Sequence, residues 1–126
     1  MKHQKVNTDN APSAIGPYSQ GILAGNWLFV SGQLGIIPGT GDLAGPDFEK
    51  EARQAIENLK QIVIAGGFEL SQVVSVEVFL ADINNFSQFN EIYGEFFSDY
   101  KPSRAVVEVS ALPKEAAIEI KCITSR

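Results

Sequence analysis

The stretch VVSVEVFLADINNFSQFNEIYGEFFSDYKPSRAVVEV, residues 73–109, decides the fold class because its hydrophobic period changes twice. Residues 73–82 alternate and are rich in β-branched side chains, which is typical of a strand. From Phe86 the apolar residues recur at helical spacing through Tyr100, and Pro102 is expected to end that helix. RAVVEV then alternates again. The stretch therefore predicts a strand–helix–strand unit with parallel strands.

Strands are also predicted on both sides of this unit. WLFVSGQL (27–34) is a compact apolar run, and the Gly25-Asn26 pair before it predicts a hairpin turn with the preceding ILA. AIEIKCIT (117–124) supplies a last strand. The order that follows is strands, helix, strand, helix, strand, strand.

The other helix is predicted directly after a Gly/Pro-rich loop at 36–47. Apolar residues at helical spacing begin at Phe48, with Asp47 as a candidate N-cap and Gly66-Gly67 as the stop. Two right-handed crossovers that step in the same direction place both helices on one face of the sheet. The predicted fold class is therefore α+β, a single domain over residues 1–126 with two helices packed on one face of a mixed β-sheet.

Strand alternation assigns the side chains to the two faces of the sheet. One parity is uniformly apolar and is expected under the helices: Leu28, Val30, Val74, Val76, Val78, Leu80, Ala105, Val107, Val109, Ile118, Ile120 and Cys122. The opposite parity leaves Phe29, Phe79, Val106 and Ile123 on a helix-free face. Apolar side chains left open in this way are more often a subunit contact than bare surface, so the sequence predicts a homo-oligomer.

Composition narrows the possible functions. A net charge of −5 and a pI near 4.8 argue against nucleic acid as a partner. His3 is the only histidine and Cys122 the only cysteine, which predicts no metal site, no cofactor bound through such ligands and no His-based nucleophile. No apolar run approaches membrane length, and the first residues lack the pattern of a signal peptide, so a cytoplasmic location is expected.

Arg104 is the residue that most needs an explanation, because it opens a predicted strand. Its planar guanidinium suits a carboxylate, which could belong to a small ligand or to a structural ion pair. Glu108 lies four strand residues away, about 13 Å, which is too far for an easy pair along the strand. Glu119, a neighbouring subunit's acid or an external anion remain, and a pocket between subunits is expected to be lined by Ser31, Arg104 and Glu119.

The remaining candidates carry weaker signals on their own. Glu119 could act as a base or could be a solvated strand residue, and Ser31-Gly32 could offer polar groups to a ligand or simply end a strand. Tyr18 follows a Gly-Pro turn, where packing is the usual role, and Asn90 could be an ordinary polar residue of a helix.

Four segments together carry a family resemblance: NAPSAIGPYSQG, LFVSGQLG, VFLADINNFSQFNEIY and KPSRAVVEVSALPKEAAIEI. They resemble the reactive intermediate deaminase family, also called the RidA or YjgF family, across residues 10–123. The resemblance implies a chorismate-mutase-like fold, a homotrimer with the sheets facing inward, and ligand clefts between subunits. It also implies hydrolysis of enamine and imine intermediates such as 2-aminoacrylate and 2-iminobutyrate to 2-keto acids and ammonia, with no cofactor.

The same resemblance implies roles for individual residues. Arg104 matches the family's carboxylate-binding arginine, and Glu119 matches the glutamate that handles the attacking water. Catalytic roles are thus expected for Glu119, Ser31 and Tyr18, and substrate-binding roles are expected for Arg104, Gly32, Asn90 and Val106, the last through its backbone carbonyl.

The sequence departs from the family pattern at three positions, and two functions other than deamination are also considered. Ala111 and Val106 stand where many bacterial members carry arginine and cysteine, and Lys121 replaces an acidic residue. The changes at Ala111 and Val106 could shift substrate preference, and Lys121 makes the charge beside the cleft less negative than is usual in the family. A non-catalytic module that senses a keto acid would need Arg104 but not Glu119, while the ribonuclease activity attributed to some relatives fits an acidic chain poorly.

Overall fold

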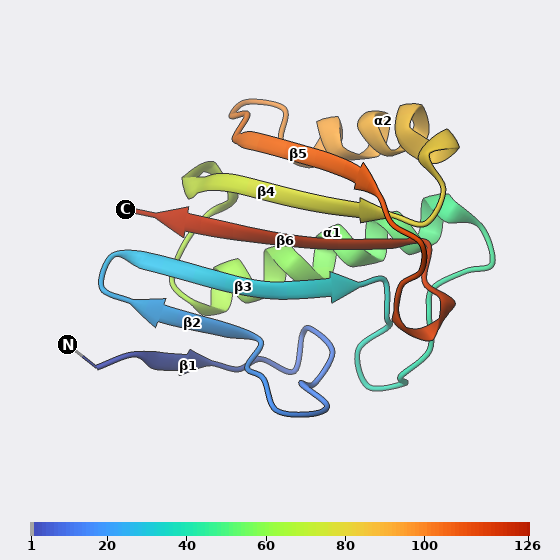
Figure 1. The fold of residues 1–126 in the computed structure, drawn as a ribbon. Helices are drawn as coiled ribbons and strands as arrows, with labels where there is room; N and C mark the ends of the chain where they lie inside the picture. Colours follow the sequence, from blue (N-terminus) through green and yellow to red (C-terminus); the bar gives the residue numbers. More distant parts are fainter. Residues whose placement is uncertain (1) are drawn as a thin grey trace.

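Alternating side chains in four long strands build a mixed sheet that carries two helices on one face (Figure 1). The computed structural model describes residues 2–126. Its elements are β1 (Gln4–Val6), β2 (Gly21–Ala24), β3 (Trp27–Leu34), α1 (Phe48–Ala65), β4 (Val73–Leu80), α2 (Phe86–Phe96), β5 (Ser103–Glu108) and β6 (Ile118–Ser125). The predicted succession of strands and helices is confirmed, and β1 is an additional short strand.

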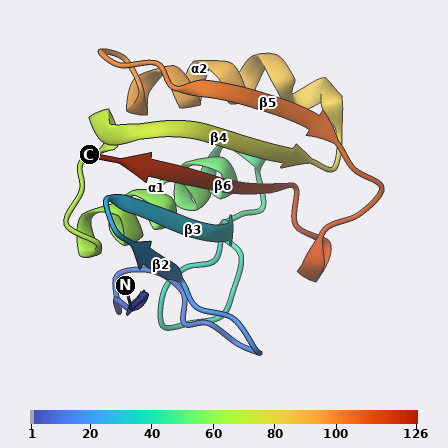
Figure 2. The ribbon, with the colours of Figure 1, turned by 60° about the vertical axis from the view of Figure 1, so that its left-hand side comes forward.

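The strand order is β1-β2-β3-β6-β4-β5. β4 and β5 are parallel, as predicted, whereas β6 pairs antiparallel with both β3 and β4 and so separates them (Figure 2). β3 and β4 therefore run in the same direction, as the first crossover requires. The last strand fills the centre of the sheet, and β1 and β5 form its two edges.

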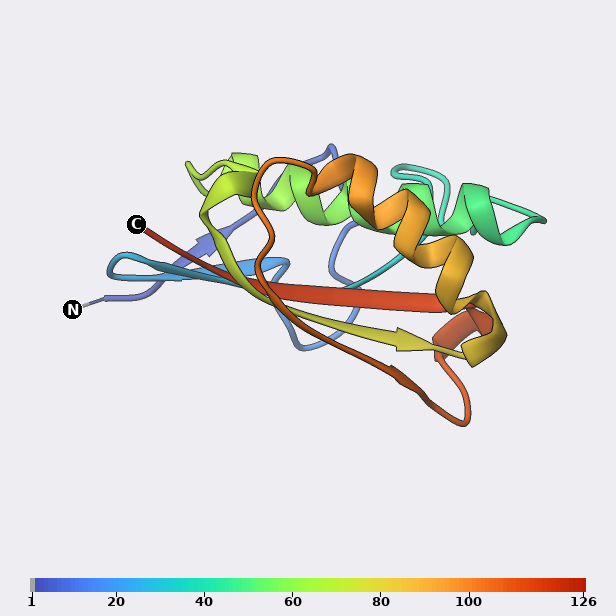
Figure 3. The same cartoon turned by 90° about the horizontal axis from the view of Figure 1, so that it is seen from above.

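Both helices lie on the same face of the sheet, as expected (Figure 3). The Asp47 side chain caps α1 by accepting a hydrogen bond from the Lys50 backbone N–H at 2.9 Å, and Gly66 forms the C-cap. α2 ends at Phe96 rather than at Tyr100. Phe97 leaves the helical conformation and stacks its ring on Tyr93 at 4.6 Å between centroids, while Tyr100 remains exposed.

The hydrophobic core lies between the sheet and the helices, and most of the predicted core residues are buried there. Val73 is buried in place of Val74, because the β4–β6 register shifts between Val73 and Ser75. Cys122 is buried as predicted, and burial raises the pKa of its thiol to about 12. Neither helix within residues 2–126 is long and apolar enough to cross a membrane.

The predicted parity of β5 is wrong. Arg104 pairs with Val76 and Val106 pairs with Val78, so both side chains lie on the helix side of the sheet. Val106 packs against the core, and Val107 is exposed on the helix-free face instead. The run Ala-Val-Val is apolar in both parities, so alternation alone could not choose between them.

Candidate active site

One wall of a mostly apolar cavity begins with an irregularity in β3. The β3–β6 register shifts between Val30 and Gln33, which frees Ser31 and Gly32 from regular pairing. The Ser31 hydroxyl donates to the Ser19 carbonyl oxygen at 2.6 Å, and the Ser31 N–H donates to the Gln20 carbonyl oxygen at 2.9 Å. The hydroxyl hydrogen is thus engaged within the chain, and the Ser31 oxygen remains as an acceptor for a ligand.

Glu119 lies against this irregularity because Gly32 has no side chain. A Cβ atom on Gly32 would come within 2.3 Å of a Glu119 carboxylate oxygen. Glu119 is half-buried and pairs with Leu34 of β3 on one side and Phe79 of β4 on the other. Within residues 2–126, no hydrogen bond or ion pair engages its carboxylate, so both oxygens are open to a ligand or water.

The loop before β2 forms the second wall of the cavity and carries Tyr18. Gln20 is buried and holds this loop, accepting from the Thr8 N–H at 2.7 Å and donating to the Pro12 carbonyl at 2.8 Å. Tyr18 is half exposed, and its hydroxyl oxygen accepts a long hydrogen bond of 3.4 Å from the Ile15 N–H. The hydroxyl hydrogen of Tyr18 is therefore available to the cavity.

The cavity has a volume of about 720 Å³ and is mostly apolar. It brings together Tyr18, Gly32 and Glu119 from the predicted set. Its other lining residues include Ile15, Gln33, Leu34, Ile36, Ile37, Pro113 and Lys114, none of which was predicted as a site residue. The Gly/Pro-rich loop that supplies Ile36 and Ile37 was visible in the sequence, but nothing in its pattern indicated which way it folds.

Lys114 enters the cavity wall from a strained turn. Lys114 and Glu115 have positive φ angles of 61° and 56°, in a conformation that side chains other than glycine rarely adopt. The buried Glu51 side chain of α1 fixes the end of this turn, accepting from the Ala117 N–H at 2.6 Å. Because Ala117 precedes Glu119 by two residues, this contact also sets the start of the strand that carries Glu119.

Arg104 forms a separate group at the edge strand β5. Its Nη1 donates to the Asn90 side-chain oxygen at 2.8 Å, so Asn90 is a partner of the arginine. The guanidinium carbon lies 5.9, 5.8 and 4.9 Å from the ring centroids of Phe86, Phe89 and Tyr93 on α2. Neither Glu108 nor Glu119 pairs with Arg104 in the part of the chain that the structure describes, and Glu108 instead accepts from the Ile83 N–H.

A single chain therefore does not bring all the predicted site residues together. Glu119, Gly32 and Tyr18 line the cavity and Ser31 adjoins it, whereas Arg104, Asn90 and Val106 lie at β5 and α2. β4 lies between β6 and β5, and Glu119 pairs with Phe79 whereas Arg104 pairs with Val76, three residues away. The two positions are therefore about 14 Å apart in the sheet, with side chains on opposite faces. We call these groups the glutamate half-site (Tyr18, Ser31, Gly32, Glu119) and the arginine half-site (Asn90, Arg104, Val106).

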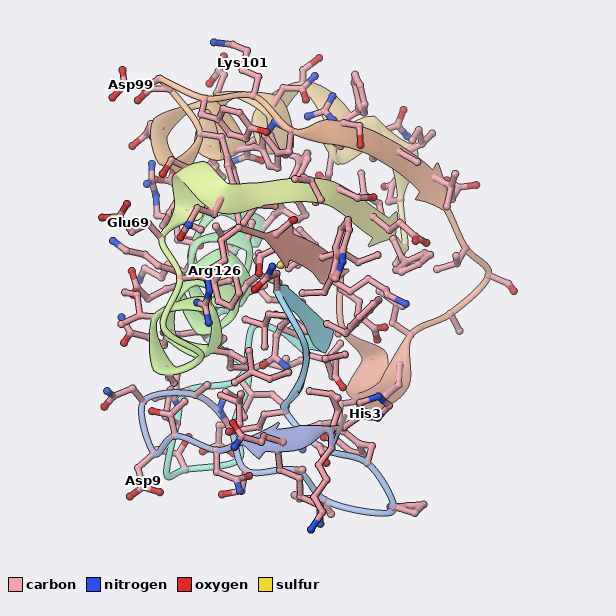
Figure 4. All side chains as sticks on the ribbon, turned by 90° about the vertical axis from the view of Figure 1, so that its left-hand side faces the viewer. His3, Asp9, Glu69, Asp99, Lys101 and Arg126 are labelled. Carbon is pink, nitrogen blue, oxygen red and sulfur yellow. The ribbon has the colours of Figure 1, made fainter. Side chains whose placement is uncertain are left out.

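His3 and Arg126, two further residues with ionisable side chains, lie away from both half-sites. His3 precedes β1, at the sheet edge opposite the end where Asp99 and Lys101 lie between α2 and β5 (Figure 4). Arg126 lies at the end of β6, with its guanidinium carbon 4.3 Å from the Phe68 ring centroid. Within residues 2–126, no cluster of three or more His, Cys, Asp or Glu side chains could hold a metal ion.

Comparison with known proteins shows which family this sequence and fold match. Residues 8–125 match the family model described as Endoribonuclease L-PSP. The human 2-iminobutanoate/2-iminopropanoate deaminase is 43% identical, over 94% of this chain and 86% of its own. A Thermotoga maritima structure described as a putative endoribonuclease superposes with a TM-score of 0.97 at 46% identity, covering 100% of this chain and 98% of its own. Escherichia coli TdcF, solved with bound serine, gives 0.93 at 39% identity, with 98% of each chain covered.

Proposed function

Because this chain belongs to the Endoribonuclease L-PSP family, which includes the reactive intermediate deaminases, we propose that it hydrolyses reactive enamine and imine intermediates. The substrates are 2-aminoacrylate and 2-iminobutyrate, and the products are 2-keto acids and ammonia. The single observation that carries the proposal concerns Arg104 of β5. Its guanidinium is held against side chains of α2 and has no carboxylate partner in residues 2–126.

Arg104 anchors the substrate carboxylate. Its Nη1 is shared with Asn90, which leaves the Nε and Nη2 donors as a fork that matches two carboxylate oxygens. Serine bound to TdcF carries a carboxylate of the same kind. Fixing this end of the substrate makes the position of the neighbouring C=N carbon predictable, and positioning is the main requirement when the substrate is already electrophilic.

Glu119 orients the water that attacks the imine carbon. An enamine first becomes an imine by protonation at carbon and loss of an N–H proton. The water oxygen forms a bond to the imine carbon while Glu119 accepts a water proton and returns it to the nitrogen. In the resulting carbinolamine, Glu119 accepts the hydroxyl proton and passes it to the amino nitrogen, the oxygen forms the C=O bond, the C–N bond breaks with its electron pair on nitrogen, and ammonia leaves. Ser31, Gly32 and Tyr18 line the end of the cleft where the imine nitrogen of the substrate is replaced by the oxygen of water.

The complete cleft forms between copies of the chain in a homotrimer with the sheets facing inward. The two half-sites lie on different faces and different strands, so a second copy must supply the missing half. Exposed apolar side chains on the helix-free face, such as Phe29 and Val107 at 45% and 46% exposure, would be covered by this association. The protein works in the cytoplasm.

The test is the rate at which imine disappears. 2-Iminobutyrate is generated in situ from threonine with a dehydratase, and its loss is followed with and without this protein at matched concentration. The wild type should accelerate the loss, whereas Arg104→Ala should abolish the acceleration while the oligomer stays intact. Acceleration by Arg104→Ala equal to that of the wild type would remove Arg104 from the mechanism.

A non-catalytic module that senses small carboxylic acids such as keto acids is the alternative. The serine bound to TdcF supports it, because serine carries a carboxylate but no C=N bond to hydrolyse. Glu119→Gln separates the two functions. In an enzyme this change reduces turnover and leaves affinity for 2-ketobutyrate in place, whereas a sensor never shows turnover. Ribonuclease action would require an acidic chain to bind RNA, and salt-dependent RNA binding that survives purification to homogeneity would indicate it.

A further inference from the structure

Three aromatic residues of α2 lie beneath Arg104. Phe86, Phe89 and Tyr93 are spaced at i, i+3 and i+7, which places them along one face of the helix. Their ring centroids lie within 5.9 Å of the guanidinium carbon, and Tyr93 is nearest at 4.9 Å. We propose that these three rings, the aromatic shelf, are positioning residues that hold the Arg104 guanidinium in the orientation in which it binds a carboxylate.

The need for such a shelf follows from the exposure of Arg104 at an edge strand. A long exposed side chain has many rotamers, and fixing it on ligand binding costs conformational entropy. Ring faces attract a guanidinium and restrict it before the ligand arrives. The hydrogen bond from Nη1 to Asn90 then fixes the rotation of the plane and leaves the Nε and Nη2 fork free.

The shelf acts through ring faces and not through the Tyr93 hydroxyl. The Tyr93 side-chain oxygen is buried and has no hydrogen-bond partner in the described chain, so it makes no polar contact with Arg104. Burial also raises the pKa of Tyr93 to about 12, which keeps the ring neutral at physiological pH. Phenylalanine should therefore replace Tyr93 without loss, whereas leucine should not.

Phe86 provides the cleanest variant. It is 36% exposed, so Phe86→Leu removes a ring face at small cost to folding and keeps an apolar side chain. Tyr100→Leu is the matched control, since Tyr100 is similarly exposed at 41% and is not part of the shelf. Tyr93→Leu and Tyr93→Phe test the nearest ring in the same way.

The inference rests on the proposed function only for its kinetic readout, and a ligand-free readout tests it separately. The Nε–H signal of Arg104, assigned by its loss in Arg104→Lys, reports the order of the side chain in NMR relaxation. The wild type, Tyr93→Phe and Tyr100→Leu should give an ordered signal, while Phe86→Leu and Tyr93→Leu should bring its order parameter below about 0.6. In the imine assay Phe86→Leu should raise KM about two- to fivefold with kcat unchanged, as expected for the loss of one exposed cation–π contact.

The outcomes distinguish this inference from the proposed function. A wild type that does not accelerate imine loss contradicts the proposed function, and the NMR signal still decides whether the shelf orders Arg104. An order parameter in Phe86→Leu and Tyr93→Leu equal to that of the wild type overturns the shelf. So does a loss of order that leaves KM unchanged in an active enzyme.

Discussion

The two half-sites are positioned by different means. The glutamate half-site is built into the backbone, since a strand irregularity, a glycine without a side chain and a buried carboxylate on α1 set where Glu119 lies. The arginine half-site is built from side chains, since Arg104 is held by one hydrogen bond and three ring faces. Glu119, the residue proposed to orient water, thus lies on a central strand, whereas Arg104, the residue proposed to bind the carboxylate, lies on an exposed surface of the edge strand.

The largest expected effect separates binding from turnover. Arg104→Ala should weaken binding of 2-ketobutyrate by about 30-fold or more, the usual result of removing one member of a hydrogen-bonded charge pair, and turnover should be lost with it. Glu119→Gln should lose turnover but bind 2-ketobutyrate as the wild type does. Calorimetric titration of the two variants measures this contrast, and equal affinities for both would contradict a division of labour between the half-sites.

The second effect concerns the backbone of the glutamate half-site. Gly32→Ala should displace the Glu119 carboxylate, because the added methyl group would lie 2.3 Å from one of its oxygens. A displacement on the order of 1 Å can reduce kcat about 100-fold. Steady-state kinetics checks the loss, with Gly94→Ala as the control.

Gly94 lies in α2 with no neighbouring atom within 4 Å of the added methyl group. The control should therefore keep full activity and gain up to about 1 kcal/mol of stability from the higher helix propensity of alanine. Equal kcat values for Gly32→Ala and the wild type would show that the close approach of Glu119 to Gly32 is not needed for the chemistry.

A smaller effect is expected from the contact that holds the start of β6. Glu51→Ala leaves the Ala117 N–H without its acceptor and should lower the free energy of unfolding by about 1–3 kcal/mol. Glu51→Gln keeps an acceptor oxygen and should cost less. Urea unfolding of both variants measures the difference, and a Glu51→Ala protein as stable as the wild type would show that this bond does not anchor the strand.

The smallest effect is a dependence of stability on alkaline pH. Burial raises the pKa of Cys122 from 9.0 to about 12 and that of Tyr93 from 10.0 to about 12. Below pH 9 both groups are protonated in the folded and unfolded states. Above it the unfolded state loses protons first, so the free energy of unfolding should fall between about pH 9 and pH 12, by at most about 1.4 kcal/mol per pH unit for each group.

Urea unfolding at several alkaline pH values measures this slope. Cys122→Ala and Tyr93→Phe each remove one of the two groups and should flatten it. Slopes unchanged in both variants would show that other groups cause the alkaline loss of stability.

The sequence predicted the glutamate half-site better than the arginine half-site. In β3 and β6 apolar and polar residues alternate with clear contrast, so the sides of Leu28, Ile120 and Glu119 could be assigned correctly. In β5 the residues Ala105, Val106 and Val107 are apolar in both parities. Packing against the core, and not the sequence pattern, determines that Val106 faces the helix side of the sheet. Such a choice depends on tertiary contacts, which alternation does not encode.

Other parts of the site could not be predicted from sequence patterns, because they also depend on tertiary structure. The cap at Asp47, the stop at Gly66 and the turn at Gly25 are local, and local chemistry predicted them. Lys114 reaches the cavity only because its turn adopts positive φ angles, a conformation that its residue types do not favour. Phe86 and Phe89 were expected on the apolar face of the helix and Tyr93 was not singled out, and the contact of these rings with Arg104 follows from the reversed parity of β5.

The most direct test of the central claim asks whether the two half-sites of one cleft come from different copies. Arg104→Ala and Glu119→Gln chains, each inactive alone, are unfolded, mixed in equal amounts and refolded together, and the formation of mixed oligomers is verified by mass spectrometry. If each cleft combines Arg104 of one copy with Glu119 of another, random assortment should restore about a quarter of wild-type turnover. Mixed oligomers without any recovered turnover would contradict the account, because they would place both groups of each cleft on a single chain.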